Sequence, residues 1–141
     1  MHRFAIRVRY SDTDQMGFAY YANYLRWFEI GRAELLRDLG MSYRQVEEEG
    51  IQLPVLEAGC RYLEPARYDD LIAIETAVSD ARRASVRFAY RVVRESDGVE
   101  LAHGWTEHCF LDRNGRPARP PASLTALLER APRAPRVAPR A

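Results

Sequence analysis

Residues 22–39 read ANYLRWFEIGRAELLRDL and form the strongest helical pattern in the chain. Their apolar residues recur at spacings of three and four, as on one face of an α-helix. The central stripe consists of Tyr24, Phe28, Gly31, Leu35 and Leu39. Further apolar side chains widen this stripe, which predicts a helix that other structure largely covers. Asn23 is placed to cap the start of the helix, and Gly40 to end it.

The segments around this helix alternate apolar and polar residues, which is typical of strands. One such segment precedes the helix and four follow it: strands are expected at 4–10, 53–63, 71–79, 84–94 and 99–111. Ser96-Asp97-Gly98 predicts a hairpin turn between the last two strands. Short helices are expected at 42–49 and 123–130.

One long apolar helix and an antiparallel sheet of about five strands make an α+β domain. We expect this domain to cover residues 1–130. Residues 131–141 repeat proline and arginine and contain little apolar surface, so we expect a flexible C-terminal tail that is disordered or weakly docked.

Composition excludes several function classes. The formal net charge of +1 over 141 residues gives no reason to expect nucleic acid or a membrane as partner. All 21 basic residues are arginine, which excludes Schiff-base chemistry on a lysine. The two cysteines, Cys60 and Cys109, do not make a disulfide framework, and both suit buried thiols. The first residues carry no apolar targeting segment, so we expect a soluble cytoplasmic protein.

The segment between the first strand and the long helix carries the residues most suited to chemistry. Residues 10–24 read YSDTDQMGFAYYANY, with Asp12 and Asp14 two positions apart and Gly17 shortly after. A helix start presents unpaired N–H groups and a positive dipole end, which attract developing negative charge. Asp14 is therefore a candidate nucleophile or general base beside an oxyanion site.

Other roles for these carboxylates stay open. Asp14 is also suited to capping a turn, as aspartate often does in loops. Asp12 is better suited to a structural role, in which it accepts bonds from loop N–H groups or pairs with an arginine. A calcium loop is rejected because its fifth and twelfth positions would be Met16 and Asn23. The histidines show no metal-binding spacing either, so we expect no metal.

The pattern D-x-D-x-x-G followed by Tyr24, and then Phe28-Glu29-x-x-Arg32 in the helix, resembles the 4-hydroxybenzoyl-CoA thioesterase family of hotdog-fold acyl-CoA thioesterases. The resemblance extends to about residue 120. It implies a hotdog fold, in which the sheet wraps around one long central helix. It also implies hydrolysis of an acyl thioester to a free acid and coenzyme A, without a metal or redox cofactor.

The resemblance assigns roles around this loop. The aspartate at the position of Asp14 serves as nucleophile or general base toward the thioester carbonyl. The backbone N–H at the position of Tyr21 polarises that carbonyl at the helix start. Gly17 is expected to allow a backbone conformation or a close approach that other residues would not.

Five further residues are candidates for substrate binding. Phe18 and Tyr20 suit the lining of an acyl pocket, although aromatic residues at such spacing are as often part of a core. Asn23 is assigned to the same site. Arg82 and Arg83, at a predicted turn, are candidate contacts for coenzyme A phosphates because arginine offers forked donors. Solvated turn arginines are the alternative.

In the resembled family, active sites lie between subunits, so we expect a homodimer or homotetramer. A hydratase or dehydratase of the same fold is an alternative, but that chemistry usually needs an Asp–His pair, and no histidine occurs between His2 and His103. A non-catalytic protein that binds acyl thioesters is another. Aromatic, short and long acyl groups all stay open, and so does acyl carrier protein in place of coenzyme A.

Overall fold

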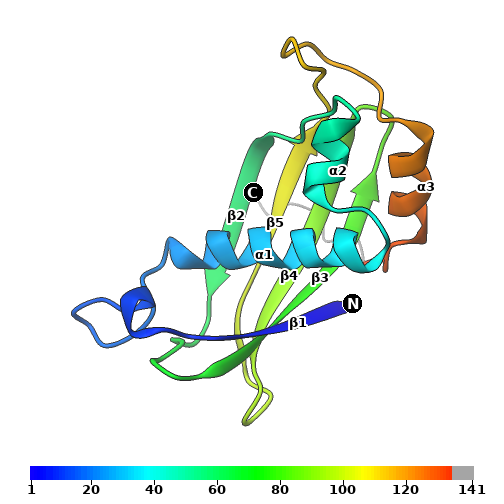
Figure 1. Ribbon diagram of the computed structural model, residues 1–141. Helices are drawn as coiled ribbons and strands as arrows, with labels where there is room; N and C mark the ends of the chain where they lie inside the picture. The colour runs from blue at the N-terminus through cyan, green and yellow to red at the C-terminus, as the bar shows by residue number, and fades with distance from the viewer. Residues whose placement is uncertain (135–141) are drawn as a thin grey trace.

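The computed structural model describes residues 1–134 of the chain. Its strands, β1 (His2–Arg7), β2 (Val55–Tyr62), β3 (Leu71–Ala81), β4 (Ser85–Arg94) and β5 (Glu100–Cys109), form one antiparallel sheet in the order β1-β3-β4-β5-β2. The helices are α1 (Asn23–Asp38), α2 (Tyr43–Glu48) and α3 (Ala122–Arg130), and α1 crosses the sheet (Figure 1). None of the described helices has the length and apolar character needed to cross a membrane.

The α+β class and the five-stranded antiparallel sheet are confirmed. α1 has 16 residues, and the short helices expected at 42–49 and 123–130 are present as α2 and α3. A central position of one long helix, wrapped by the sheet, stays a prediction. The first strand is shorter than predicted at its end. The Arg9 N–H donates to the Asp12 carboxylate (2.8 Å) and Thr13 N–H to the Tyr10 carbonyl (3.1 Å), which turns the chain into a single 3₁₀ turn.

The predicted hairpin turn between β4 and β5 is confirmed. Gly98 has a φ of +73°, a conformation that suits glycine. Its N–H donates to the Arg94 carbonyl (2.8 Å), and the Arg94 N–H donates to the Val99 carbonyl (2.9 Å). The turn between β4 and β5 therefore forms where the sequence predicted it.

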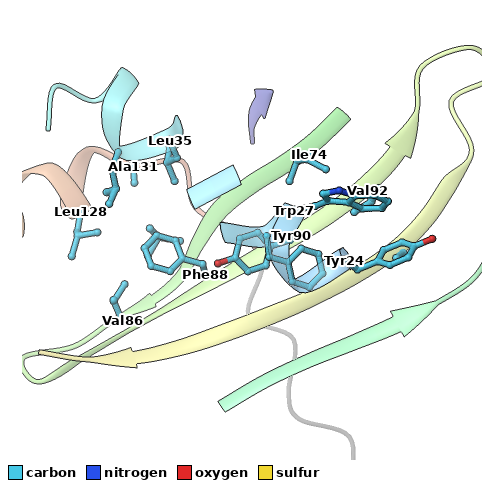
Figure 2. Close-up of a cluster of buried hydrophobic side chains, with 14 of the residues drawn as sticks. Tyr24, Trp27, Leu35, Ile74, Val86, Phe88, Tyr90, Val92, Leu128 and Ala131 are labelled. Carbon is cyan, nitrogen blue, oxygen red and sulfur yellow. The ribbon is translucent and has the colours of Figure 1, made fainter. Parts of the chain in front are cut away.

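Close packing of α1 on the sheet depends on Gly31. A Cβ atom at this position would lie 2.7 Å from the Ile74 side chain and also overlap the Thr76 hydroxyl. Beside it, the rings of Phe28 and Tyr90 stack with centroids 4.4 Å apart. Figure 2 shows Tyr90 and other sheet side chains gathered with Trp27 of α1 in the core.

A chain of polar side chains is buried in this core. The Tyr90 and Thr106 hydroxyls are 2.6 Å apart, and Nε2 of His108 lies 2.8 Å from the Thr106 hydroxyl. Nδ1 of His108 lies 3.0 Å from the Leu53 carbonyl oxygen. Burial lowers the pKa of His108 to about 4, and the positive charge of Arg32 acts in the same direction. His108 is therefore neutral at physiological pH.

The segment after α3 is docked where we expected the flexible tail to begin. Ala131 is buried, the Val78 N–H donates to the Pro132 carbonyl (2.8 Å), and the Ala134 N–H donates to the Val78 carbonyl (3.0 Å). These bonds occupy the β3 edge beyond Thr76, where the pairing with β1 ends. Unpaired edge groups explain why this segment docks. Residues 135–141 of the predicted tail lie outside the described residues.

Candidate active site

The loop that carries Asp14 is closed by its own backbone. Thr13 and Ala19 form an isolated antiparallel bridge across it. The Asp14 N–H donates to the Phe18 carbonyl (3.0 Å), and the Gly17 N–H donates to the Asp14 carbonyl (3.0 Å). Gly17 has a φ of +84°, so its backbone does adopt a conformation that disfavours other residues.

One oxygen of the Asp14 carboxylate is held within this loop. Oδ1 accepts a hydrogen bond from the Met16 N–H at 2.9 Å, which is the turn-capping arrangement that the sequence left open. Within residues 1–134, the second oxygen accepts no hydrogen bond. The carboxylate is therefore oriented through one oxygen and has the other available.

Asp12 joins the loop to its surroundings. Its side chain accepts from the Arg9 N–H, and its carbonyl accepts from the Tyr20 N–H and from Nδ2 of Asn23, both at 2.8 Å. Asn23 is 8% exposed, and its amide is used in this contact, so it positions the loop rather than facing solvent. The predicted helix cap is wrong, since Ala22 is the N-cap and no side chain bonds to the first turn.

The start of α1 offers a free backbone donor next to this loop. Within the described part of the chain, the Tyr21 N–H has no hydrogen-bond acceptor. The Tyr21 carbonyl, in the peptide group that follows this N–H, accepts a hydrogen bond from the Tyr62 hydroxyl at 2.9 Å, which fixes that peptide group against the end of β2. The dipole of α1 adds partial positive charge here.

Aromatic side chains surround the helix start and stay exposed. Tyr20, Tyr21 and Tyr62 are 46%, 62% and 46% exposed, whereas Phe18 is half-buried. The Tyr20 and Tyr21 rings lie 4.8 Å apart, and Tyr62 meets Tyr21 edge-on at 6.4 Å. The pKa of Tyr20 is raised, first by its interaction with the Tyr21 hydroxyl and also by the Asp14 charge.

Arg82 and Arg83 are not brought to this loop within one chain. Both arginines follow the end of β3. The start of β3 lies on the side of the Asp14 loop, because the Val8 N–H, shortly before that loop, donates to the Asp70 carbonyl (2.9 Å). Because β3 has 11 residues at about 3.3 Å each, its two ends lie about 33 Å apart. Figure 1 shows the loop that carries Asp14 and α3 at opposite sides of the molecule.

β2 forms an exposed edge beside the helix start. Among the described strands it pairs only with β5, so its other edge is unpaired. Val55 and Leu56 are 48% and 59% exposed on this strand. Such an apolar edge is typical of a surface that another chain covers.

Sequence reasoning did not identify Tyr62 as a part of the site. Its hydroxyl donates a hydrogen bond to the Tyr21 carbonyl, and partial desolvation, with the neighbouring Cys60, raises its pKa to about 12. The only available signal was a tyrosine near the end of a predicted strand. The contact joins residues 41 positions apart, which local periodicity does not reveal.

Three known proteins illustrate what this chain is similar to. YneP of Bacillus subtilis is 38% identical over 108 residues, which cover 77% of this chain and 78% of YneP. The acyl-CoA thioesterase YbgC of Haemophilus influenzae is 37% identical over 94 residues, 66% of this chain and 69% of YbgC. The crystal structure of a hypothetical protein from Thermus thermophilus is 35% identical, has a TM-score of 0.86, and covers 90% of this chain and 96% of that one.

The family model described as the thioesterase-like superfamily matches residues 8–130. The match includes the Asp14 loop, α1 and the sheet from β2 to β5. The narrower resemblance to 4-hydroxybenzoyl-CoA thioesterases stays a prediction. The chain belongs to the thioesterase-like superfamily, whose hotdog fold it shares.

Proposed function

We propose that this protein hydrolyses acyl-CoA thioesters to a free acid and coenzyme A, with Asp14 acting on the thioester carbonyl. The protein is a thioester hydrolase, like its relatives in the superfamily. The observation that carries the proposed mechanism is the Asp14 carboxylate, held by Met16 at one oxygen and free at the other, beside an unpaired N–H at the start of α1.

The Tyr21 N–H is the proposed donor to the carbonyl oxygen. As the carbonyl carbon becomes tetrahedral, its oxygen gains negative charge, which this N–H and the dipole of α1 stabilise. The Tyr20 carbonyl, in the same peptide group as this N–H, accepts from the Asn23 N–H (3.0 Å), and Tyr62 holds the next peptide group through the Tyr21 carbonyl, which limits the reorganisation needed when the charge develops. A donor of this kind contributes about 2.7–4 kcal/mol to transition-state stabilisation.

Asp14 has two possible routes. As a general base it takes a proton from water, whose oxygen bonds to the carbonyl carbon while the C–S bond breaks and the thiolate leaves. As a nucleophile its oxygen bonds to that carbon, the C–S bond breaks and the thiolate leaves, and water later splits the resulting anhydride into the free acid and the Asp14 carboxylate. Acid quenching during turnover, followed by mass spectrometry of the peptide that contains Asp14, separates the two. An acyl group on that peptide supports the nucleophile.

The exposed aromatic surface and the edge of β2 support a site completed by a second copy. Tyr20 and Phe18 then line the acyl group together with surface from the partner. Pairing along β2 would satisfy the free edge and cover Val55 and Leu56. We propose a homodimer as the smallest active unit, with a homotetramer as the larger possibility.

A panel of aromatic, short and long acyl-CoA substrates, with free thiol as readout, tests the activity. Release of thiol above the uncatalysed rate supports the proposal, and acyl carrier protein thioesters can be added to the same panel. Tight binding of all substrates without thiol release would favour the non-catalytic alternative. Hydration of an enoyl thioester without hydrolysis would favour the hydratase. A cytoplasmic location and the lack of a cofactor stay predictions.

A further inference from the structure

A second backbone N–H next to that of Tyr21 has no hydrogen-bond acceptor within residues 1–134. It belongs to Ala22, the residue that precedes α1, whose dihedral angles are already helical (φ −69°, ψ −20°). The Asn23 N–H, one residue later, is occupied, because it donates to the Tyr20 carbonyl (3.0 Å). Unpaired N–H groups in a first helical turn point outward from the helix start, where a capping oxygen can accept from either of two neighbouring ones.

Tyr62 acts on the peptide group that carries the Ala22 N–H. The Tyr62 hydroxyl donates to the Tyr21 carbonyl at 2.9 Å. This carbonyl and the Ala22 N–H belong to one planar trans peptide group, so the N–H points away from the carbonyl. The hydroxyl therefore fixes the direction of the N–H. A carbonyl that accepts a hydrogen bond also polarises its own peptide group, which makes the N–H a stronger donor.

The sheet holds the Tyr62 side chain in place. Tyr62 is the last residue of β2, and the N–H groups of Leu63 and Glu64 both donate to the Leu101 carbonyl on β5 (2.9 and 3.1 Å). The Tyr62 ring meets the buried Tyr24 ring edge-on, with centroids 5.0 Å apart. A side chain on an anchored strand, packed against a core residue, places its hydroxyl more precisely than a loop residue does.

The segment that follows Tyr62 also holds the Asp14 loop. The Ala66 carbonyl accepts from the Ala19 N–H (2.8 Å), and the Ala66 N–H donates to the Tyr24 hydroxyl (3.3 Å). Ala19 lies in the bridge that closes the Asp14 loop. This short segment therefore contacts both the loop and the helix start, and it fixes the position of one relative to the other.

The Tyr62 hydroxyl contributes little to folding. Tyr62 is 46% exposed, so its hydroxyl can bond to water when the chain unfolds or when the carbonyl moves. A hydrogen bond that replaces one with water changes the free energy of unfolding only slightly. The Tyr21 carbonyl also accepts from the Tyr24 N–H at 3.4 Å, so it keeps a donor without Tyr62. Removal of the hydroxyl should therefore affect catalysis more than stability.

We propose that Tyr62 is a positioning residue for the hydrolysis, and that it aims the Ala22 N–H as a second donor, beside the Tyr21 N–H, at the thioester carbonyl oxygen. The inference rests on the proposed function, because it needs a thioester carbonyl at the start of α1. When the carbonyl carbon becomes tetrahedral, the two N–H groups share the negative charge that forms on its oxygen. Neither N–H transfers its proton.

The first test is Tyr62→Phe, which removes the hydroxyl and keeps the ring. For every acyl-CoA that the wild type hydrolyses, kcat should fall by at least about threefold, with KM and the melting temperature close to the wild-type values. A residue that only lines the acyl pocket would instead change KM by a factor that depends on the acyl group. Tyr62→4-aminophenylalanine restores a donor and should restore kcat. The control is Tyr68→Phe, since the exposed Tyr68 hydroxyl makes no hydrogen bond within the described residues.

The second test removes the donor itself. Ala22→lactic acid replaces this N–H by an ester oxygen and keeps the methyl side chain, so kcat should fall by at least about tenfold. The same replacement at Ala122, the first residue of α3, removes an N–H at a helix start far from Asp14 and should leave kcat unchanged. Because Tyr62 acts through the Ala22 N–H, Tyr62→Phe should lower kcat less in the Ala22 ester than in the wild type.

The outcomes separate this inference from the proposed function. A wild type that hydrolyses acyl-CoA, with an unchanged kcat in Tyr62→Phe or in the Ala22 ester, would overturn the inference and leave the proposed function standing. An equal effect of Tyr62→Phe with and without the Ala22 N–H would also overturn it, because Tyr62 would then act by another route. A wild type that releases no thiol from any acyl thioester would refute the proposed function, and the inference with it.

Discussion

Two aspartates separated by one residue differ in how their oxygens are used. The carboxylate of Asp12 accepts from the Arg9 N–H, and its carbonyl accepts from the Tyr20 N–H and the Asn23 side chain. One carboxylate oxygen of Asp14 accepts from the Met16 N–H, and within residues 1–134 the other accepts no hydrogen bond. The sequence favoured Asp12 for a structural role, which agrees with its hydrogen bonds, and the role of Asp14 stays a prediction. The free oxygen of Asp14 depends on hydrogen bonds that a residue pattern does not specify.

His108 makes a testable contribution to pH-dependent stability. Its pKa is lowered from 6.5 to about 4 in the folded chain, chiefly by burial, so between these values the unfolded chain binds more protons. The contribution of His108 to the free energy of unfolding should therefore be constant above about pH 7. It should fall as the pH is lowered, and the loss should reach about 3 kcal/mol at pH 4. Urea titrations at several pH values measure this slope.

The matched variants are His108→Gln and His103→Gln. The first should be less stable at pH 7 but should lose most of the acid-dependent decline. The second removes a histidine whose side chain is 46% exposed on the same strand and should keep the decline. Equal slopes in wild type and His108→Gln would show that other groups cause the decline.

The local sequence patterns predicted the helices and strands, with their ends displaced by a few residues. Strict alternation in 84–94 predicts β4 (Ser85–Arg94), and the stripe in 22–39 predicts α1 (Asn23–Asp38). The sequence left open a tail that is disordered or weakly docked. The docking of Pro132 and Ala134 depends on the unpaired β3 edge, which is a property of the assembled sheet and not of the local pattern.

The contact of α1 with β3 can be tested at Gly31. Gly31→Ala should lower the free energy of unfolding by about 1–3 kcal/mol, because the added methyl group overlaps Ile74 and the Thr76 hydroxyl. That hydroxyl is buried and has no hydrogen-bond partner within the described residues, so Thr76→Ala should be tolerated.

The double variant Gly31→Ala/Thr76→Ala should lose less stability than the sum of the single variants, by at least about 0.5 kcal/mol. Gly31→Ala combined with Thr125→Ala on α3 should be additive. Additivity in both pairs, measured by urea unfolding, would mean that the helix does not press on Thr76.

At the scale of the whole molecule, the unpaired edge of β2 predicts self-association. Leu56→Glu places a charge on a side chain that is 59% exposed in the single chain, so the fold should tolerate it. The wild type should sediment as a dimer or tetramer, and the variant should shift toward monomer and lose activity. Val99→Glu, at a residue 36% exposed on the β4–β5 hairpin, is the control. A wild-type monomer with full activity at micromolar concentration would refute the shared site.

The measurement that tests the account most directly is the turnover of Asp14→Asn on the best acyl-CoA substrate of the panel. The amide keeps an oxygen that can accept from the Met16 N–H, so the loop and the melting temperature should be preserved. It supplies neither a base nor a nucleophile, so kcat should fall by at least about 100-fold. Asp12→Asn should retain far more activity if its loop bonds survive. An Asp14→Asn enzyme that folds and turns over at near the wild-type rate would contradict the central role of Asp14.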